Sequence, residues 1–304
     1  MTDSIVSLSG LTKTFGRRAA VSNVSLEVQR AHICGLIGPN GAGKTTIMKM
    51  LAGLCEPASG SMSLFGSGDL AAQRSRVSFM LEAPIIDPGL SARDNMRYVQ
   101  IIRGVVADND RITSLLELVK LDPAEKKSVR KYSLGMKQRL GIAMALLPDP
   151  ELLVLDEPVN GLDPEGIVEI RRLLKRLSEE QGKTILISSH LLAEMAELCT
   201  DYAIINRGAL VEQLSHEELL SHCRDHISIR TDDINRTAAV IEEKLGTRNY
   251  RVVHGEEIQL MERLDDIAGV SRAITESGLT ITRLISEGES LEQYYLSKVG
   301  DSND

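Results

Sequence analysis

Nine consecutive residues near the start of the chain have the types and spacing of a phosphate-binding turn. They run Gly38-Pro39-Asn40-Gly41-Ala42-Gly43-Lys44-Thr45-Thr46. The apolar run before them predicts a buried strand over 33–37, and the residues after them predict a helix over 47–51. A strand, a glycine-rich turn and Gly-Lys-Thr at the start of a helix form the phosphate cradle called a P-loop.

The chemistry of this turn comes from backbone, charged and hydroxyl groups together. Its glycines let backbone N–H groups face the β- and γ-phosphates, where a Cβ would clash. The helix N-terminus adds partial positive charge, Lys44 adds a full charge, and the Thr45 hydroxyl is placed to ligate Mg²⁺. The turn therefore predicts binding of a nucleoside triphosphate with Mg²⁺.

A pair of acids follows a second expected strand. Asp156 and Glu157 come directly after Leu152–Leu155, an apolar run typical of a buried strand. An acid at the carboxyl end of such a strand, beside a P-loop, can hold Mg²⁺ through water, which is the role expected of Asp156. Glu157 is placed to orient or deprotonate an attacking water, a role worth roughly 10²–10⁴ in rate.

Length and charge bound the class of protein. The chain has 304 residues, enough for one large domain and a small one, and a net charge of −8. The acidic balance gives no general basic surface for nucleic acid, although a local basic patch stays compatible with it. Because no apolar stretch approaches a membrane span and the N-terminus lacks a signal peptide, we expect a cytosolic protein. Work at a membrane would require another chain.

The elements that position these residues alternate between strand and helix patterns. Short β segments are predicted over 5–8 and 24–28, and further strands over 61–65, 77–81, 151–155 and 184–188. Residues from about 88 to 147 have helical periodicity, which predicts a helical subdomain inserted between sheet strands. Helices over 164–181 and 190–198 and a hairpin over 201–213 complete this part.

Beyond about residue 215 the pattern changes. The expected order is strand, helix, two strands, helix and strand, the split βαβ pattern, followed by a helix over 290–299. We therefore predict an ATP-binding α/β domain over 1–220, with its helical subdomain at about 88–147, and a small accessory domain over 221–304. The second domain is expected to be α+β, with a ferredoxin-like arrangement as the candidate.

Three motifs resemble one family. Leu152–Pro164 resembles the Walker B motif and D-loop of ATP-binding cassette (ABC) proteins, and Tyr132–Arg139 resembles their signature motif. His190 matches their switch histidine. The resemblance covers residues 1 to about 220. It implies a P-loop NTPase fold of ABC type, with a mixed sheet core, an antiparallel β subdomain and an inserted helical subdomain.

The resemblance also implies a dimer that sandwiches two ATP molecules. Ser133 and Gly135 of one subunit would bind the γ-phosphate held by the other, and Asp163 of the D-loop would couple the two sites. His190 would hydrogen-bond the γ-phosphate and hold Glu157 and the water in place. The signature departs from the common Leu-Ser-Gly-Gly-Gln, because Leu134 replaces its first glycine and Met136 its glutamine.

Two further positions complete the expected site. Phe15 occupies the place of the aromatic residue that stacks on adenine in this family; the alternative is a core phenylalanine. Glu82 stands where most members carry the Q-loop glutamine. A carboxylate there can ligate Mg²⁺ but repels phosphate; the alternative is an exposed acid unrelated to ATP.

The function expected is the ATPase subunit of a bacterial ABC exporter, which powers a separate permease at the inner face of the cell membrane and dimerises on ATP binding. Glu82, the signature sequence and the tail over 290–296 resemble the branch that exports bacitracin and lantibiotic peptides. Export of a lipid, a drug or another envelope substrate is an alternative. So are a soluble ABC ATPase acting on ribosomes or DNA and a regulatory module with little turnover.

Overall fold

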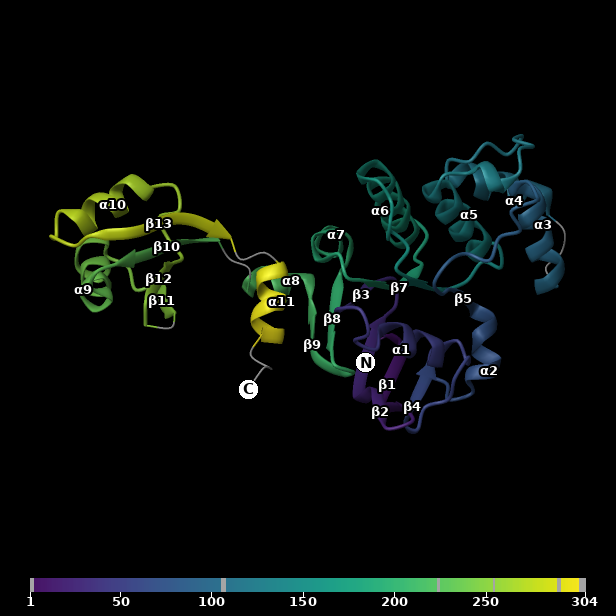
Figure 1. Ribbon diagram of the computed structural model, residues 1–304, viewed down its shortest axis with the longest axis horizontal. Helices are drawn as coiled ribbons and strands as arrows, with labels where there is room; N and C mark the ends of the chain where they lie inside the picture. Colours follow the sequence, from purple (N-terminus) through teal and green to yellow (C-terminus); the bar gives the residue numbers. More distant parts are fainter. Residues whose placement is uncertain (1–2, 105–107, 223–224, 254, 289–290, 301–304) are drawn as a thin grey trace. The chain divides into compact units, whose positions relative to one another are not determined.

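The computed structural model describes residues 3–104, 108–222, 225–253, 255–288 and 291–300 (Figure 1). Its internal contacts divide the chain into two compact units, Met1–His216 and Glu217–Asp304.

The first unit is built on a six-stranded sheet in the order β5-β6-β7-β3-β8-β9. The strands are β3 (Ile33–Ile37), β5 (Val77–Met80), β6 (Leu152–Asp156), β7 (Thr184–Ser189), β8 (Asp201–Asn206) and β9 (Ala209–Ser215). All are parallel to their neighbours except β9, which is antiparallel to β8. Every residue of β3, β6 and β7 is buried, and accordingly apolar residues run unbroken over Leu152–Leu155 in β6 and Ile185–Ile187 in β7. Their carboxyl ends share one edge of the sheet.

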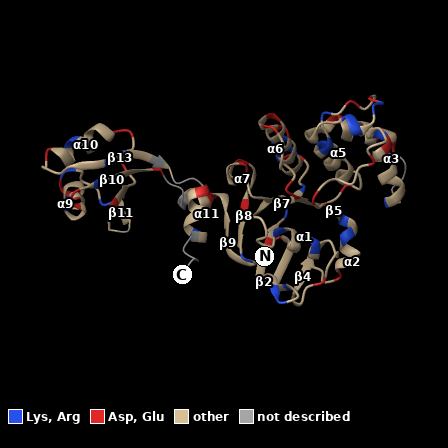
Figure 2. Ribbon diagram, in the orientation of Figure 1, with Lys and Arg blue, Asp and Glu red and all other residues tan. Residues whose placement is uncertain are grey.

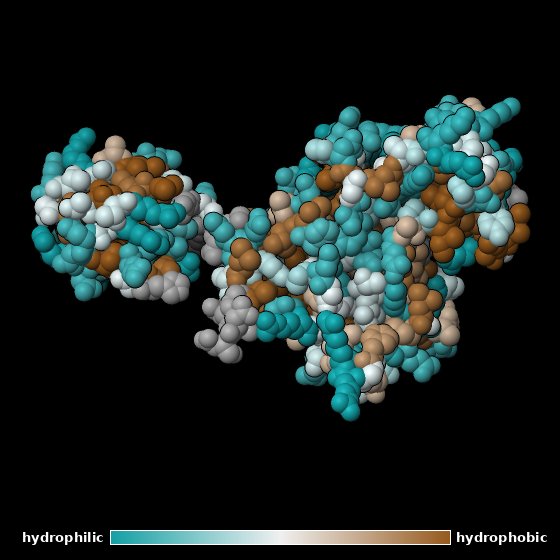
Figure 3. Space-filling model, viewed as in Figure 1, coloured by the Kyte–Doolittle hydropathy of each residue, from teal (hydrophilic) through white to brown (hydrophobic). Residues whose placement is uncertain are grey.

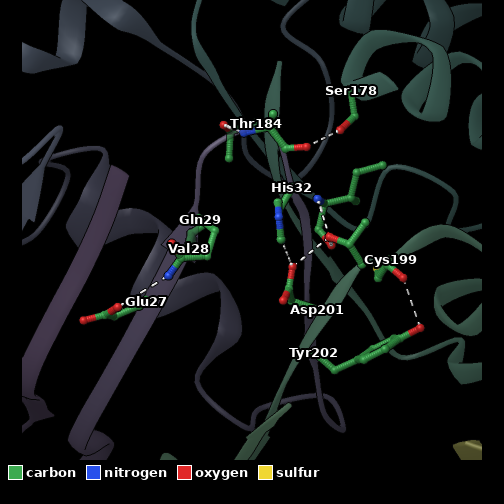
Figure 4. A network of polar contacts seen from close by, with 12 residues as sticks. Glu27, Val28, Gln29, His32, Ser178, Thr184, Cys199, Asp201 and Tyr202 are labelled. Atoms are coloured by element: carbon green, nitrogen blue, oxygen red, sulfur yellow. Dashed lines mark hydrogen bonds and ion pairs between the residues drawn. The ribbon is translucent and has the colours of Figure 1, made fainter. Parts of the chain in front are cut away.

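The opposite edge carries a polar network that fixes the strand starts (Figure 4). His32 Nδ1 lies 2.5 Å from Asp201 Oδ2, which joins the residue before β3 to the first residue of β8. The Ser178 hydroxyl donates to the carbonyl of Ala31 at 2.9 Å, and the Ala31 N–H donates to Thr184 Oγ1 at 2.8 Å. These bonds satisfy polar groups that the buried strands cannot pair there.

A second, antiparallel sheet has the order β2-β1-β4, with β1 (Ser4–Phe15), β2 (Arg18–Gln29) and β4 (Ser59–Leu64). Both β1 and β2 are twelve residues long, much longer than the segments predicted over 5–8 and 24–28. Several register shifts interrupt the pairing of β1 with β2. Each shift breaks the alternation of apolar and polar residues, so only the regular stretches carry the sequence signal.

Helices cover the sheets and form the inserted helical subdomain. They are α1 (Lys44–Leu51), α2 (Leu70–Gln73), α3 (Ala92–Arg103), α4 (Asn109–Leu118), α5 (Leu134–Leu146), α6 (Pro164–Glu179) and α7 (Leu192–Leu198), with 3₁₀ turns at Arg74–Arg76 and Val129–Lys131. In the chain, α3, α4 and α5 lie between β5 and β6. The Ser91 side chain caps α3 by accepting from the Asp94 N–H. The α/β fold with its helical insertion is confirmed.

The second unit is an antiparallel sheet in the order β11-β12-β10-β13. Its elements are α8 (His216–His222), β10 (Asp225–Thr231), α9 (Ile234–Val240), a π-helical turn (Ile241–Leu245), β11 (Tyr250–Val253), β12 (Glu257–Leu260), α10 (Ile267–Thr275), β13 (Ile281–Gly288) and α11 (Leu291–Gly300). The first and last strands of the split βαβ pattern lie side by side, as in a ferredoxin-like fold. The unit has its own apolar core around Ile227, Ile229, Ile258 and Ile274.

Charge is divided unequally between the two units. The sequence over 217–304 holds ten Lys and Arg and eighteen Asp and Glu, so the whole net charge of −8 belongs to this unit. Figure 2 shows its acidic residues spread over several helices and loops instead of gathered in one patch. Among the described residues, no helix combines the length and apolar character that crossing a membrane requires.

Candidate nucleotide-binding site

The P-loop joins β3 to α1 and is held between two other segments. Gly43 precedes α1 and has a φ of 112°. Because glycine has no side chain, Gly43 does not cap the first N–H groups of the helix. A Cβ on Gly43 would collide with the carbonyl oxygen of Ala20 in β2, and a Cβ on Gly38 with that of Ile205 in β8. Backbone approach this close is possible only for glycine, so both positions are fixed by packing as well as by chemistry.

The residues of the loop divide into an exposed tip and a buried base. Pro39, Asn40 and Gly41 are exposed, Ala42 is buried, and Thr45 and Thr46 lie in the first turn of α1. Lys44 is only 5 % exposed. Its ammonium group donates to the carbonyl oxygens of Gly38 at 2.6 Å and Pro39 at 3.3 Å. The lysine charge is therefore held at the concave side of the turn.

The acidic pair lies beside this lysine. Asp156, at the carboxyl end of β6, is 2 % exposed and accepts a hydrogen bond from the Ser188 hydroxyl. Glu157 has φ 50°, a left-handed conformation that turns its side chain out of the strand direction. Its Oε1 lies 3.4 Å from Lys44 Nζ. Its Oε2 lies 2.7 Å from His190 Nδ1. The structure thus brings together Lys44, Asp156, Glu157 and His190 from three segments: the start of α1, the end of β6 and the end of β7.

Glu82 follows β5 and also has a left-handed backbone, with φ 63°. Its side chain is exposed, and its Oε1 lies 2.7 Å from Lys49 Nζ on α1. The hydrogen bond and charge of Lys49 lower the pKa of the Glu82 carboxyl. The sequence reasoning did not single out Lys49. Its spacing of four residues from Thr45, which places both on one face of α1, is the signal that could have found it.

Phe15 is the last residue of β1 and is 56 % exposed. The alternative of a core phenylalanine is therefore wrong. Lys13 Nζ lies 5.2 Å from the centroid of its ring. The β1–β2 hairpin also carries Ala20, whose carbonyl borders Gly43 of the P-loop. An exposed aromatic ring thus lies on a hairpin that contacts the phosphate cradle.

Ser133, Gly135 and Asp163 lie at the starts of two other helices. The Ser133 hydroxyl accepts from the Met136 N–H and caps α5, and Asp163 caps α6 by accepting from the Gly166 N–H. Ser133 is exposed, and its hydroxyl oxygen caps the start of α5. Both hydrogen bonds stay within their own helices. Within one chain they do not link Ser133 or Asp163 to the P-loop.

A large apolar groove of about 1040 Å³ opens between β5, α3 and α5. Its lining includes Phe79, Ile85, Tyr98 and Ile102, and Ile85 is 94 % exposed. Figure 3 shows hydrophobic side chains at the surface beside α3. Exposed apolar side chains gathered in one groove are typical of interaction surfaces.

Comparisons with known proteins agree with this geometry. A family model described as "ABC transporter" matches residues 21–160. The chain is 37% identical to the bacitracin transport ATP-binding protein BcrA of Bacillus licheniformis, over 98% of both chains. It is 40% identical to the lantibiotic transport ATP-binding protein SrtF of Streptococcus pyogenes, over 70% of this chain and 92% of that one.

A solved structure shares the fold of the first unit. It is a dimeric ATP-binding cassette in a post-hydrolysis state, bound to ADP and Pi, with a TM-score of 0.61 at 24% identity. The match covers 69% of this chain and 98% of the other.

Proposed function

The chain belongs to the ABC transporter family as an ATP-binding, ATP-hydrolysing protein, and on that premise we propose that it powers export of a bacitracin-like or lantibiotic peptide through a separate permease. The observation that carries the substrate class is similarity to BcrA over 98% of both chains, including the C-terminal unit. The expected family, fold and enzyme class are confirmed. The peptide substrate and the residue roles below are proposals.

At each site, ATP phosphates would lie on the P-loop N–H groups and the N-terminus of α1, with Lys44 as the full positive charge. Phe15 would stack on adenine through its exposed ring. Glu157 would accept a proton from the attacking water. Its carboxylate is already held by Lys44 on one oxygen and His190 on the other. His190 would also donate to the γ-phosphate, which fixes the distance between water and phosphorus.

The residues present fit a Mg²⁺ ion. Thr45 offers a hydroxyl oxygen at the first turn of α1, and Asp156 offers a buried carboxylate that is oriented by the Ser188 hydroxyl. Hard oxygen ligands of this kind suit Mg²⁺, which keeps several waters of its own. Glu82 is the third candidate, through its position after β5. When bound, Mg²⁺ neutralises charge that develops on the phosphates.

A second copy would complete each site. Ser133 and Gly135 stand at the N-terminus of α5, where an anion is favoured. A γ-phosphate held by a second subunit would supply that anion, and Asp163 would lie at the same contact. The apolar groove between α3 and β5 would receive a helix of the permease, because a partner helix with apolar side chains would cover its exposed residues.

Two measurements test ATP hydrolysis and the identity of the transported substrate separately. The purified chain should hydrolyse ATP, and Glu157→Gln should lower the rate by about 10²–10⁴ while ATP binding persists. Cells that carry the chain with the permease that copurifies with it should tolerate more bacitracin or lantibiotic than cells with the Glu157→Gln form. Equal tolerance of both forms to every such peptide would contradict the peptide substrate and leave ATP hydrolysis standing.

A further inference from the structure

The Lys49–Glu82 ion pair connects the helix that follows the P-loop to the loop that follows β5. Lys49 is on α1, one turn beyond Thr45, and Glu82 is two residues past the end of β5. Their charged atoms are 2.7 Å apart, a hydrogen-bonded contact. The two residues are separated by 33 positions in sequence, so only the fold brings them together.

This pair lies at the edge of the sheet that carries the acids of the site. Strands β5 and β6 are parallel neighbours, with Met80 opposite Leu155, so Glu82 and Asp156 leave the sheet at the same end. Glu82 raises the pKa of the Lys49 ammonium through their hydrogen bond, and the charge of Asp156 raises it further. The Lys49 ammonium group therefore interacts electrostatically with both carboxylates that border the expected phosphate position.

A carboxylate at position 82 creates an electrostatic problem that an amide would not. With Asp156 and Glu157 it adds a third negative charge near the phosphates of ATP. Like charges in a partly solvated site repel, and the repulsion opposes binding of an anion. Glu82 also occupies a left-handed backbone conformation, which holds its carboxylate away from the ordinary strand direction. The ion pair with Lys49 is a contact that offsets its charge.

We propose that Lys49 is a positioning residue for nucleotide binding: it neutralises and orients Glu82, so that this chain can bind MgATP with a carboxylate where an amide is usual. The inference rests on nucleotide binding at the P-loop and is independent of the transported substrate. On this proposal the two charges offset each other. Replacing Glu82 with glutamine should therefore restore the nucleotide affinity that is lost when the Lys49 charge is removed.

A double-mutant cycle on the full chain tests this dependence. Affinity for the non-hydrolysable analogue AMP-PNP with Mg²⁺ is measured by titration calorimetry for the parent, Lys49→Met, Glu82→Gln and the double variant. Lys49→Met should weaken binding about tenfold, because it leaves the Glu82 charge uncompensated beside the phosphates. The double variant, which lacks both charges of the ion pair, should bind AMP-PNP within about twofold of the parent, because removing two opposite charges together leaves the net charge beside the phosphates unchanged.

Two controls separate this role from general loss of charge or fold. Lys120→Met removes a lysine from another surface ion pair, which Lys120 makes with Glu169 on α6, and should leave AMP-PNP affinity unchanged. Lys49→Arg keeps the positive charge and should retain most of the affinity. Thermal unfolding without nucleotide should be alike in all variants, because an exposed ion pair of this kind contributes about 0–1 kcal/mol to stability.

A double variant that binds AMP-PNP as weakly as Lys49→Met would overturn the proposal, because removing the Glu82 charge would then have restored nothing, as would an unchanged affinity of Lys49→Met. Those results would leave nucleotide binding by the parent intact. Absence of AMP-PNP binding by the parent chain would instead contradict the proposed function itself.

Discussion

At the scale of single residues, Glu157 shows how backbone and side chain act together. Its φ of 50° directs the carboxylate away from the strand, and Lys44 and His190 then hold one oxygen each. A residue in the left-handed region costs about 1–3 kcal/mol and persists where surrounding contacts over-determine it. The surrounding contacts here include two hydrogen bonds from the Glu157 N–H to Ser188.

Cys34 gives a prediction about reactivity. Burial in β3, with a smaller contribution from Asp201, raises the pKa of its thiol to about 12. At pH 8 the native thiol is therefore protonated, and we expect iodoacetamide to modify half-buried Cys55 at least roughly 100-fold faster. Peptide mapping by mass spectrometry measures both rates.

The same shift has a defined effect on stability. Folding raises the pKa of the Cys34 thiol. The free energy of unfolding is therefore at its full value, as far as this group is concerned, below the ordinary pKa of 9.0, and it falls as pH rises through about 12. Rapid modification of Cys34 in the folded chain at pH 8 would contradict its burial.

At the scale of elements, the signature helix and the D-loop contact each other within one chain. A Cβ on Gly161 would lie 3.1 Å from Leu134 Cδ2, and a Cβ on Gly135 would lie 3.7 Å from Leu162 Cδ2. Leu134 occupies a position that is glycine in the common signature, and its side chain makes this contact possible. It supports the D-loop that carries Asp163.

We predict that Leu134→Ala loosens the D-loop without harming nucleotide binding. Removing an apolar contact of a half-exposed leucine costs about 1 kcal/mol, equal to about fivefold in the population of the supported loop. The maximal ATPase rate should fall about fivefold while the ATP concentration for half-maximal rate stays within about twofold. Leu134→Met, which keeps the contact, should retain the parent rate. A matching loss in nucleotide affinity would show that the residue acts on the P-loop instead.

Elements with regular patterns could be predicted closely from sequence. The strands expected over 77–81, 151–155 and 184–188 match the bounds of β5, β6 and β7 to within one residue at each end. The helix expected from His190 begins at Leu192, because Ser189 still belongs to β7 and His190 is used by the contact with Glu157. The partner of Glu82 could not be predicted, since a pair 33 residues apart depends on how two elements pack.

At the scale of the whole molecule, two units with separate cores predict two unfolding events. Calorimetry of the full chain should show two transitions. MgATP at a concentration of about one hundred times its dissociation constant should stabilise the unit Met1–His216 by about 2.7 kcal/mol. It should therefore raise the midpoint temperature of that transition only. A single transition that shifts as a whole would contradict independent units.

The fold class could be predicted at this scale, because the motifs require particular residues to meet at one site. The order of the strands in the sheet could not be predicted. Lys44, Asp156 and His190 have to converge, so the strands before them have to share an edge. Nothing in the local sequence places β3 between β7 and β8, or sets the acidic unit on a sheet of order β11-β12-β10-β13. Those pairings join residues far apart in the chain.

The place of β3 has a consequence for how the protein is made. Its neighbours β7 and β8 begin at Thr184 and Asp201, and the P-loop packs against Ile205. At about 5–20 residues per second, a ribosome takes roughly 10–30 s to pass from Gly38 to Ile205. During that interval the apolar residues of β3 have neither of these neighbouring strands. The nascent chain therefore exposes its phosphate-binding strand early and buries it late, which makes this strand a segment in need of protection during synthesis.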